Sequence, residues 1–562
     1  MLTEPKTPID PPTSRRGRAR LTALGPAVDA LGRRWAAWDS DEKEGALGLG
    51  APAAGDRSRS LSRTAVIGLA ASTAVVLGGL MGGSTYETHL PGAWFFGMPG
   101  GHLGWIGANS LVPPISAAIA VYAGLIVLSR VWIGLLRELR RHPGTPVTRI
   151  VAVVSAWAVP FIVSPPLFSR DVYSYAGQGE MVSHHINPSL YGTGVLGSTP
   201  FSMFPDVVWT NTPSPYGQSF LSIDGLLDDI SAHGMLLDLV LLRLLEVAAL
   251  GLALWAIPHL ARRAGKDPAG TVLLAGSPLV LVTLVSGAHN DALMAGLLLA
   301  GLAVAFRVGM VPGIVVCALA TGVKSPAALG VVFLGWMWAG RDAPLGRRLA
   351  HAAAAGAIAL GTLEVVSLIS GLGWGWISNS GAADKSFTLV TPVDAVSRLA
   401  ADLLVHVHPG ATALGVRTVL SVVGLGCAGG LCLWLLVRST GHDLVRNLGL
   451  SLLLVAALGP ILWSWYVTWG VLVLAPVAGP RLRTLLVALC TFELFTGVAT
   501  LHSVYATLVS AGVVESLLLA AVLVAALLVP LPQFSRRRVA PRELGRGSDD
   551  AAPEATLAGV AP

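Results

Sequence analysis

The stretch MLLDLVLLRLLEVAALGLALWAIP at residues 235–258 decides the class of fold. It is an almost continuous apolar run, of the length that an α-helix needs to cross a bilayer, which is about 20 residues. Such runs recur along the 562-residue chain, and only 12% of its residues are charged, against roughly 25% in soluble domains. The sequence therefore predicts an all-α polytopic membrane protein. It excludes a secreted disulfide scaffold, a disordered chain and a nucleic-acid-binding domain.

The apolar runs divide the chain into a membrane domain and two tails. We expect residues 1–63 to form a cytoplasmic, mostly disordered tail, residues 64–534 the membrane domain, and residues 535–562 a cytoplasmic C-terminal tail. The membrane domain should hold about 13–14 transmembrane or re-entrant helices. Their apolar segments are 65–83, 112–136, 149–168, 235–258, 269–287, 290–307, 309–323, 326–340, 350–372, 413–437, 447–460, 464–478, 482–500 and 510–532.

Lys and Arg residues set the expected orientation, because cytoplasmic loops are enriched in them. When the N-terminal tail is placed in the cytoplasm, alternate loops such as 137–149 and 341–348 carry clusters of Arg, whereas the opposite loop 84–111 has no Lys or Arg. We therefore expect a multi-pass plasma-membrane protein with both termini in the cytoplasm. Its large extracytoplasmic loops are 169–234 and 373–412.

Two pairs of short segments predict broken helices. Residues 309–340 and 447–479 each start and end near cytoplasmic Arg residues, yet two full spans need about 40 residues. Each pair should therefore meet at a polar apex, at TGVKSP (321–326) and at GPILWSWY (459–466). Broken helices of this kind are tolerated where they line a cavity.

The motif SRDVYSY at 169–175 is the strongest candidate for chemistry. Asp171 follows the apolar segment 149–168 directly, so its carboxylate should stand where the helix leaves the membrane on the outer face. A carboxylate held there can act as general base for a substrate hydroxyl that arrives from the aqueous side. The alternative is that Asp171 only caps the next helix, as Asp commonly does.

The turn GAHND at 287–291 is a second candidate on the same side. His289, Asn290 and Asp291 bring three polar side chains into a very tight turn, which can hold a hydroxyl-rich or phosphate ligand. The alternative is a plain helix–helix turn in which Asn and Asp cap a helix.

The two apices supply a cation and three aromatic side chains. An ammonium inside a membrane protein is costly and indicates a site, so Lys324 is expected to bind an anion such as a lipid phosphate unless it snorkels to the interface. Trp463, Trp465 and Tyr466 suit the faces of sugar rings, and the alternative is an interfacial aromatic belt.

The remaining polar features leave their roles open. Arg243 and Glu246 lie three residues apart in the segment 235–258, so they either neutralise each other or face a cavity. The four cysteines lie in apolar runs and show no disulfide or metal-ligand spacing. No Walker A motif, dinucleotide-binding glycine pattern or HExxH helix is present.

Taken together, these residues resemble a known family. The chain is similar to the actinobacterial α-1,6-mannosyltransferases of lipomannan and lipoarabinomannan synthesis, which belong to the GT-C superfamily of polyprenyl-phosphate-sugar-dependent glycosyltransferases. The long N-terminal tail resembles the MptB type. The motifs that carry the resemblance are SRDVYSYAGQGEM (169–181), INPSLYG (186–192), TPSPYG (212–217), GAHND (287–291), TGVKSP (321–326) and WSWY (463–466).

The resemblance implies a GT-C-like bundle and a reaction on the outer face of the plasma membrane. Mannose would pass, with inversion, from polyprenyl-phosphate-mannose to a phosphatidylinositol-mannoside or lipomannan acceptor, with α-1,6 bonds as the product. Asp171 would be the general base, and Lys324 and Arg170 would bind the donor phosphate, without a metal or other cofactor. Sugar or acceptor contacts are implied for Tyr173, Tyr175, Tyr216, His289, Asn290, Asp291, Trp463, Trp465 and Tyr466.

Two other functions remain open at the level of sequence. A related GT-C enzyme could use another lipid-linked sugar. A lipid-linked-sugar flippase or secondary transporter would also have broken helices near its binding site.

Overall fold

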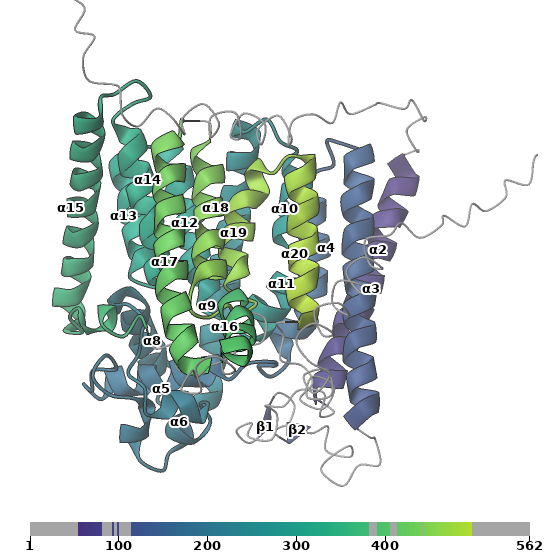
Figure 1. Ribbon diagram of the computed structural model, residues 1–562. Coiled ribbons are helices and arrows are strands. Elements are labelled where there is room, and N and C mark those ends of the chain that lie inside the picture. Colours follow the sequence, from purple (N-terminus) through teal and green to yellow (C-terminus); the bar gives the residue numbers. More distant parts are fainter. Residues whose placement is uncertain are drawn as a thin grey trace, which may run out of the picture.

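The structure, a computed structural model, describes residues 54–80, 93–94, 98–99, 114–381, 391–404, 413–441 and 443–496. The predictions for residues 1–53, for the apolar segment 510–532 and for the tail 535–562 lie outside the described residues. Within the described ranges, helices stand side by side in a bundle, and a smaller group of short helices lies at one end of it (Figure 1). The predicted all-α polytopic class is confirmed.

Five helices are long and apolar enough to cross a membrane. A sixth candidate span is bent by 41°, because Pro278 interrupts the predicted segment 269–287 and cannot donate a backbone hydrogen bond. The five are α2 (Ala54–Gly78), α3 (Pro114–Arg141), α9 (Met235–Arg263), α15 (Leu345–Ser370) and α17 (Ala413–Arg438); the bent one comprises α10 (Pro268–Ala275), α11 (Pro278–Val280) and η4 (Leu281–Ser286). α2 begins earlier than predicted and takes in residues 54–63 of the expected tail.

The remaining bundle helices are shorter, and among them are the two predicted broken pairs. A helix of 12 residues spans about 18 Å, less than the hydrocarbon core of about 30 Å. The pairs α13/α14 and α18/α19 therefore turn back inside the bundle, as expected. The bounds are α4 (Val147–Val163), α12 (Asp291–Arg307), α13 (Met310–Thr321), η5 (Ser325–Ala327), α14 (Ala328–Trp338), α18 (Leu444–Leu458), α19 (Val467–Leu474), η8 (Ala475–Val477) and α20 (Pro480–Thr496).

The predicted loop 169–234 is a compact helical layer and not an extended loop. Its helices lie together at the lower end of the bundle in Figure 1. They are α5 (Asp171–Ser183), η3 (Thr193–Leu196), α6 (Pro200–Met203), α7 (Val207–Thr210) and α8 (Gln218–Ile230). The second large loop contributes η6 (Gly375–Ile377) and α16 (Pro392–Leu404), and the strands β1 (Ala93–Trp94) and β2 (Met98–Pro99) pair antiparallel.

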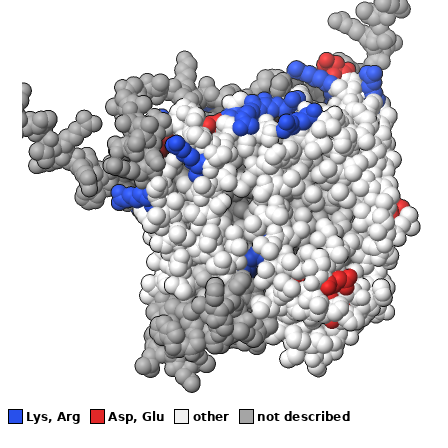
Figure 2. Space-filling model, turned by 180° about the vertical axis from the view of Figure 1, so that it is seen from behind, with Lys and Arg blue, Asp and Glu red and all other residues white. Residues whose placement is uncertain are grey.

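Charge is distributed unevenly between the two ends of the bundle. Figure 2 shows Lys and Arg side chains gathered along the upper edge, whereas α5, α6 and α8 lie at the lower end in Figure 1. The long sides between these ends are almost free of charge in this view. The asymmetry agrees with the distribution of Lys and Arg that the sequence predicts.

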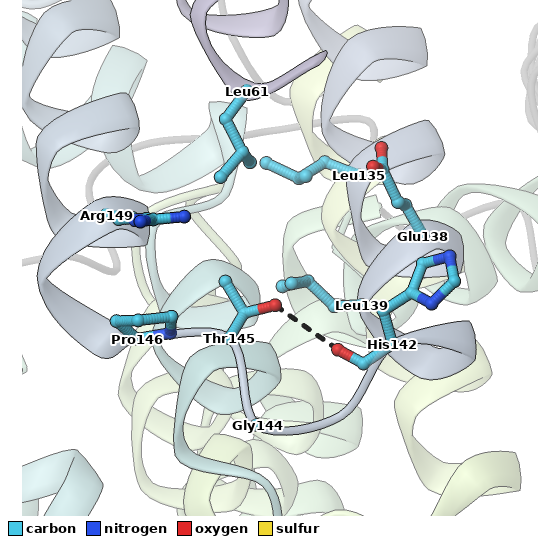
Figure 3. Close-up of a pocket in the computed structure, with 9 residues that line it drawn as sticks. All are labelled: Leu61, Leu135, Glu138, Leu139, His142, Gly144, Thr145, Pro146 and Arg149. Atoms are coloured by element: carbon cyan, nitrogen blue, oxygen red, sulfur yellow. Dashed lines mark hydrogen bonds between the residues drawn. The ribbon is translucent and has the colours of Figure 1, made fainter. Parts of the chain in front are cut away.

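A small cavity lies at the end of the bundle where α3 ends and α4 begins (Figure 3). Its volume of about 60 Å³ has room for a few water molecules, which need roughly 10–15 Å³ each. Because it lies at the opposite end of α4 from Asp171, it is separate from the predicted site. The lining residues are Leu61, Leu135, Glu138, Leu139, His142, Gly144, Thr145, Pro146 and Arg149.

Candidate active site

Arg243 ties together the two turns that carry the candidate residues. From the interior of α9, its guanidinium donates hydrogen bonds to the carbonyl oxygens of Ile162 (3.2 Å), Ser164 and Ser286 (3.0 Å). The first two carbonyls end α4, just before α5, and the third ends η4, just before α12. Arg243 is therefore a positioning residue that holds the starts of α5 and α12 beside each other.

Glu246 places the first turn of α12 against α9. Its Oε2 accepts a hydrogen bond from the backbone N–H of Leu293 at 2.9 Å, which satisfies one of the unpaired donors at a helix start. Gly296 lets the two helices approach closely, since a Cβ there would lie 2.4 Å from the carbonyl oxygen of Ala249. Arg243 and Glu246 thus serve different backbone groups, which answers the question that the sequence left open.

A hydrogen-bonded chain connects the start of α5 with His289. The backbone N–H of Asp171 donates to Ser169 Oγ (3.1 Å), Ser169 Oγ lies 3.0 Å from His289 Nε2, and His289 Nδ1 lies 2.6 Å from the carbonyl oxygen of Thr283. Since a carbonyl only accepts, Nδ1 carries the proton, and in the neutral ring Nε2 accepts from the Ser169 hydroxyl. His289 Nε2 lies 3.7 Å from Asp171 Oδ2, too far for a hydrogen bond.

Stacked rings form a wall beside this chain. The ring of His289 stacks on Trp465 at 3.9 Å between centroids, and Trp465 stacks on Trp463 at 4.9 Å with an interplanar angle of 5°. Gly287 makes room for the imidazole, because a Cβ there would lie 2.7 Å from both His289 Cε1 and the carbonyl oxygen of Thr283. The apex tryptophans therefore line the site instead of forming only an interfacial belt.

Lys324 is neither exposed at an interface nor an isolated cation. Its Nζ donates to both carboxylate oxygens of Asp291 at 2.9 Å each, and Trp469 Nε1 donates to the same carboxylate. Three rings surround the ammonium: their centroids lie 4.8 Å away for Tyr466, 5.5 Å for Tyr216 and 5.6 Å for Trp469. Such contacts stabilise a cation that has lost most of its water.

The start of α8 is docked directly on the first apex. The backbone N–H of Ser219 donates to the carbonyl oxygen of Gly322 at 3.0 Å, so the apex satisfies a donor at the helix start. The approach requires glycine, because a Cβ on Gly217 would lie 2.4 Å from that same carbonyl oxygen. This docking places Tyr216 beside Lys324.

Tyr175 and Tyr216 join the two halves of the site. Their hydroxyl oxygens are 3.5 Å apart and their rings meet edge to face at 5.2 Å between centroids. Burial raises the pKa of both phenols well above the ordinary value, so the hydroxyls stay protonated. The charge of Asp171 acts on both phenols. Tyr175 lies one helical turn after Asp171 on α5, and Tyr216 contacts Tyr175.

Among the carboxylates of this cluster, Asp171 is the one that remains accessible. Its side chain is 19% exposed, whereas Asp291 is fully buried and its oxygens are taken up by Lys324 and Trp469. Burial raises the pKa of Asp171, while the nearby His289 and Lys324 oppose that rise. The geometry thus separates a structural carboxylate, Asp291, from one that is open for chemistry.

Three of the predicted residues stand apart from these contacts. Tyr173 points to another face of α5 and packs on Phe204, with 6.0 Å between ring centroids. Arg170 precedes α5, and its carbonyl oxygen accepts from the N–H groups of Tyr173 and Ser174. Asn290 is fully buried at the start of α12, but its side chain makes no capping hydrogen bond.

Two residues of the site were not predicted. Ser169 links the Asp171 backbone to His289, and Trp469 donates to Asp291. Trp469 lies three residues after Tyr466, on the same side of α19, and the two rings stack at 4.4 Å between centroids. Helical spacing from the predicted WSWY motif was therefore a usable signal for Trp469.

The fold and the site define a polytopic membrane protein in which a cluster of side chains joins an accessible carboxylate, a paired lysine and stacked aromatic rings. The family model described as alpha-(1->6)-mannopyranosyltransferase, N-terminal domain, matches residues 65–340, and the one described as MptB C-terminal domain matches residues 395–529. The chain therefore belongs to the MptA/MptB family of α-(1→6)-mannopyranosyltransferases, which confirms the family predicted from the sequence.

Curated relatives of this chain come from mycobacteria and corynebacteria. It is 29% identical to alpha-(1->6)-mannopyranosyltransferase A of Mycobacterium tuberculosis, over 74% of this chain and 80% of the relative. It is 27% identical to a probable alpha-(1->6)-mannopyranosyltransferase of Mycolicibacterium smegmatis, over 74% and 79%. For alpha-(1->6)-mannopyranosyltransferase B of Corynebacterium glutamicum the values are 24%, 75% and 74%. No solved structure matches significantly.

Proposed function

We propose that this protein is an inverting mannosyltransferase. It moves mannose from polyprenyl-phosphate-mannose to a lipid-anchored mannan, such as a phosphatidylinositol-mannoside or lipomannan, and forms α-1,6 bonds. Membership of the family supports the type of reaction. The observation that carries the proposed mechanism is the accessible carboxylate of Asp171 beside the buried pair of Lys324 and Asp291.

Asp171 acts as the general base. The 6-hydroxyl oxygen of the acceptor attacks the anomeric carbon of mannose, the bond from that carbon to the phosphate oxygen breaks, and the hydroxyl proton passes to Asp171. One displacement converts the β-linked donor into an α-linked product, with polyprenyl phosphate as the leaving group. A positioned base of this kind contributes roughly 10²–10⁴-fold to the rate.

Lys324 donates a hydrogen bond to the leaving phosphate while its ammonium stays paired with Asp291. An ammonium has three N–H donors, and two of them point to the Asp291 oxygens, which leaves the third for a phosphate oxygen. Arg170, which directly precedes Asp171, is the second candidate cation. A preorganised donor at a developing negative charge is worth about 3–4 kcal/mol in a transition state.

The aromatic wall suits the sugars of both substrates. The stacked rings of His289, Trp465 and Trp463 offer a flat apolar face, whereas the hydroxyls of Tyr175 and Tyr216 offer polar contacts on the α5 side. A pyranose has the same combination of apolar C–H faces and polar edges.

We place the site on the outer side of the plasma membrane and both termini in the cytoplasm. The Lys and Arg side chains along the opposite end of the bundle support this orientation (Figure 2), because cytoplasmic loops are enriched in them.

The test is an assay of the purified full-length protein with polyprenyl-phosphate-mannose and a short α-1,6-mannoside acceptor. We expect the acceptor to gain mannose through a new α-1,6 bond, identified by mass spectrometry and NMR. A flippase or transporter leaves the acceptor unchanged, and an enzyme for another lipid-linked sugar elongates it only when supplied with that donor. Either of these results would overturn the proposal.

A further inference from the structure

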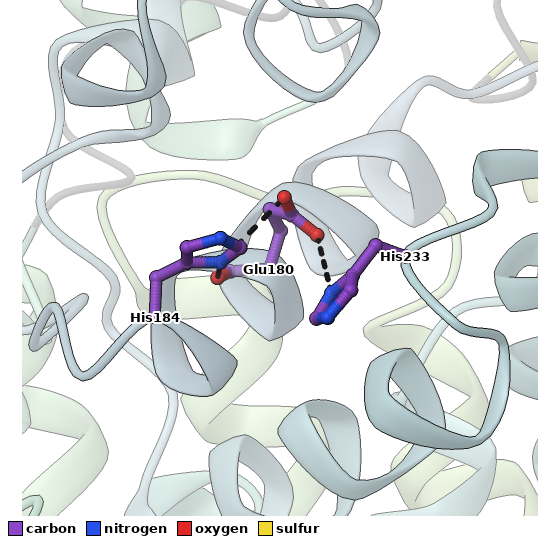
Figure 4. A group of neighbouring side chains, drawn as sticks. All are labelled: Glu180, His184 and His233. Carbon is purple, nitrogen blue, oxygen red and sulfur yellow. Dashed lines mark hydrogen bonds and ion pairs between the residues drawn. The ribbon is translucent and has the colours of Figure 1, made fainter.

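A second polar cluster lies at the other end of α5. Glu180 and His184 occupy one side of its last turns, and His233 reaches them from the turn between α8 and α9 (Figure 4). Glu180 Oε1 lies 3.6 Å from His184 Nδ1, and Glu180 Oε2 lies 3.1 Å from His233 Nδ1. One ligand atom from each residue lies within 4.8 Å of the others.

This spacing suits a transition-metal ion. Zinc binds imidazole nitrogen and carboxylate oxygen at about 2.0–2.2 Å in a tetrahedron, which sets neighbouring ligand atoms about 3.3–3.6 Å apart. The ligand atoms of Glu180, His184 and His233 lie within 4.8 Å of one another, and His184 Nδ1 also lies 2.9 Å from the carbonyl oxygen of Glu180, which leaves its Nε2 as the nitrogen for an ion. Two imidazoles and one carboxylate also form a common ligand set for zinc, and the side chains of His184 and His233 are half exposed, so an ion can reach them.

Two buried carboxyl groups lie beside the cluster. Asp228 is fully buried and its Oδ2 lies 2.7 Å from His233 Nδ1, while Asp224, one turn earlier on α8, is also fully buried. Within the described part of the chain, three of their carboxyl oxygens have no hydrogen-bond partner: both oxygens of Asp224 and Oδ1 of Asp228.

The charged groups that act on these carboxylates do not include a Lys or Arg. Those acting on Glu180 are Asp228, His184 and His233, and those acting on Asp224 are other carboxylates: Asp228, Asp238 and Glu246. The cations among the groups that act on Glu180 are thus the two histidines, when protonated. A bound divalent cation would lie between Glu180 and the two imidazoles, and Asp228 faces the same His233 nitrogen, Nδ1, as Glu180 does.

We propose that Glu180, His184 and His233 bind a divalent transition-metal ion, with Zn²⁺ as the best fit. The ion would link the end of α5 to the turn between α8 and α9. Because Asp171 begins the same helix, the site would fix the orientation of α5 without taking part in the transfer of mannose.

The experiment measures metal bound to the purified full-length protein, prepared with an affinity tag that contains no histidine. The protein is treated with EDTA, desalted, mixed with one equivalent of Zn²⁺ and desalted again. We expect about one zinc per chain by mass spectrometry of the metal content, and a higher temperature of thermal unfolding than for the EDTA-treated protein. In His184→Ala and in His233→Ala, the amount of zinc retained per chain should fall at least tenfold, and zinc should no longer raise the unfolding temperature.

The neighbouring His185→Ala is the matched control, since His185 is exposed on the same turn but lies outside the cluster. It should retain zinc like the wild type. Because the His184 side chain is half exposed, its removal leaves the packing intact, and His184→Ala remains informative even if another variant fails to fold. The proposal is overturned if the wild type retains no zinc, or if His184→Ala retains as much as His185→Ala.

Discussion

Lys324 and Asp291, which are 33 residues apart in the sequence, form a pair in which one ammonium donates to both carboxylate oxygens at 2.9 Å. The pair assigns different roles to the two carboxylates of the site. Asp291 is fully buried and committed to Lys324, whereas Asp171 keeps an accessible side chain. The pair also joins the apex of the first broken helix to the start of α12.

The first prediction concerns this pair. Lys324→Ala leaves the Asp291 carboxylate buried without its cation, and breaking a buried pair in this way typically costs about 3–5 kcal/mol. We expect a lower temperature of thermal unfolding and a lower kcat/KM for the lipid donor. In Lys324→Ala/Asp291→Asn the unfolding temperature should partly recover, whereas donor kinetics should not. Unchanged donor kinetics in Lys324→Ala would remove Lys324 from the phosphate site.

The second prediction concerns Arg243. Arg243→Met removes three hydrogen bonds to carbonyl groups, those of Ser164 and Ser286 buried and that of Ile162 partly buried, and each buried unsatisfied group costs about 1–3 kcal/mol. The starts of α5 and α12 should separate, so both stability and mannose transfer should fall. Arg243→Lys should restore little, because an ammonium lacks the planar fork that reaches two turns at once. Wild-type unfolding temperature in Arg243→Met would contradict this role.

A third prediction follows from the environment of Asp171. A general base works only when it is ionised, and burial raises the pKa of this carboxyl above its ordinary value of 3.8. The rate should therefore fall on acidification at a higher pH than an unperturbed Asp would give. The acidic limb of the kcat/KM profile measures this pKa in the free enzyme. An acidic limb that reaches down to pH 3.8 or below would contradict the prediction.

The fourth prediction separates catalysis from the proposed metal site. The leaving group is a monophosphate that Lys324 can serve, so transfer should need no metal. In His184→Ala, which lacks a ligand of the proposed site, EDTA should leave the initial rate of transfer unchanged, and added Mn²⁺ or Mg²⁺ should not raise it. Loss of this variant's activity in EDTA, with recovery in Mn²⁺ or Mg²⁺, would show that the reaction itself uses a metal.

Most of the residues that the sequence predicts for the site lie at chain turns, and the structure brings many of these turns together. Asp171, His289 and Lys324 each sit where an apolar segment ends on the side poor in Lys and Arg, and this pattern is readable without a structure. Which polar groups then pair is decided by tertiary packing. The bonds from Lys324 to Asp291, and from Arg243 to Ser286, join segments whose contact has no local signal.

Helical geometry explains why one predicted tyrosine of α5 joins the site and the other does not. Tyr175 lies one turn after Asp171 and joins the site, whereas Tyr173, only two positions after Asp171, points about 200° away around the helix and packs on Phe204. A prediction of residues 169–234 as a loop gives no helical register, so it cannot distinguish Tyr173 from Tyr175. The break at Pro278, in contrast, has a local signal, because Gly276, Ser277 and Pro278 interrupt the apolar run 269–287.

The most direct test of the account is the turnover of Asp171→Asn, which keeps the size of the side chain but removes the base. At normal expression and unfolding temperature, we predict that mannose transfer falls by at least roughly 100-fold. Asp206→Asn is the matched control, since Asp206 caps α7 in the same helical layer and Asn caps equally well; it should stay active. Turnover of Asp171→Asn within a few fold of the wild type would show that Asp171 is not the base.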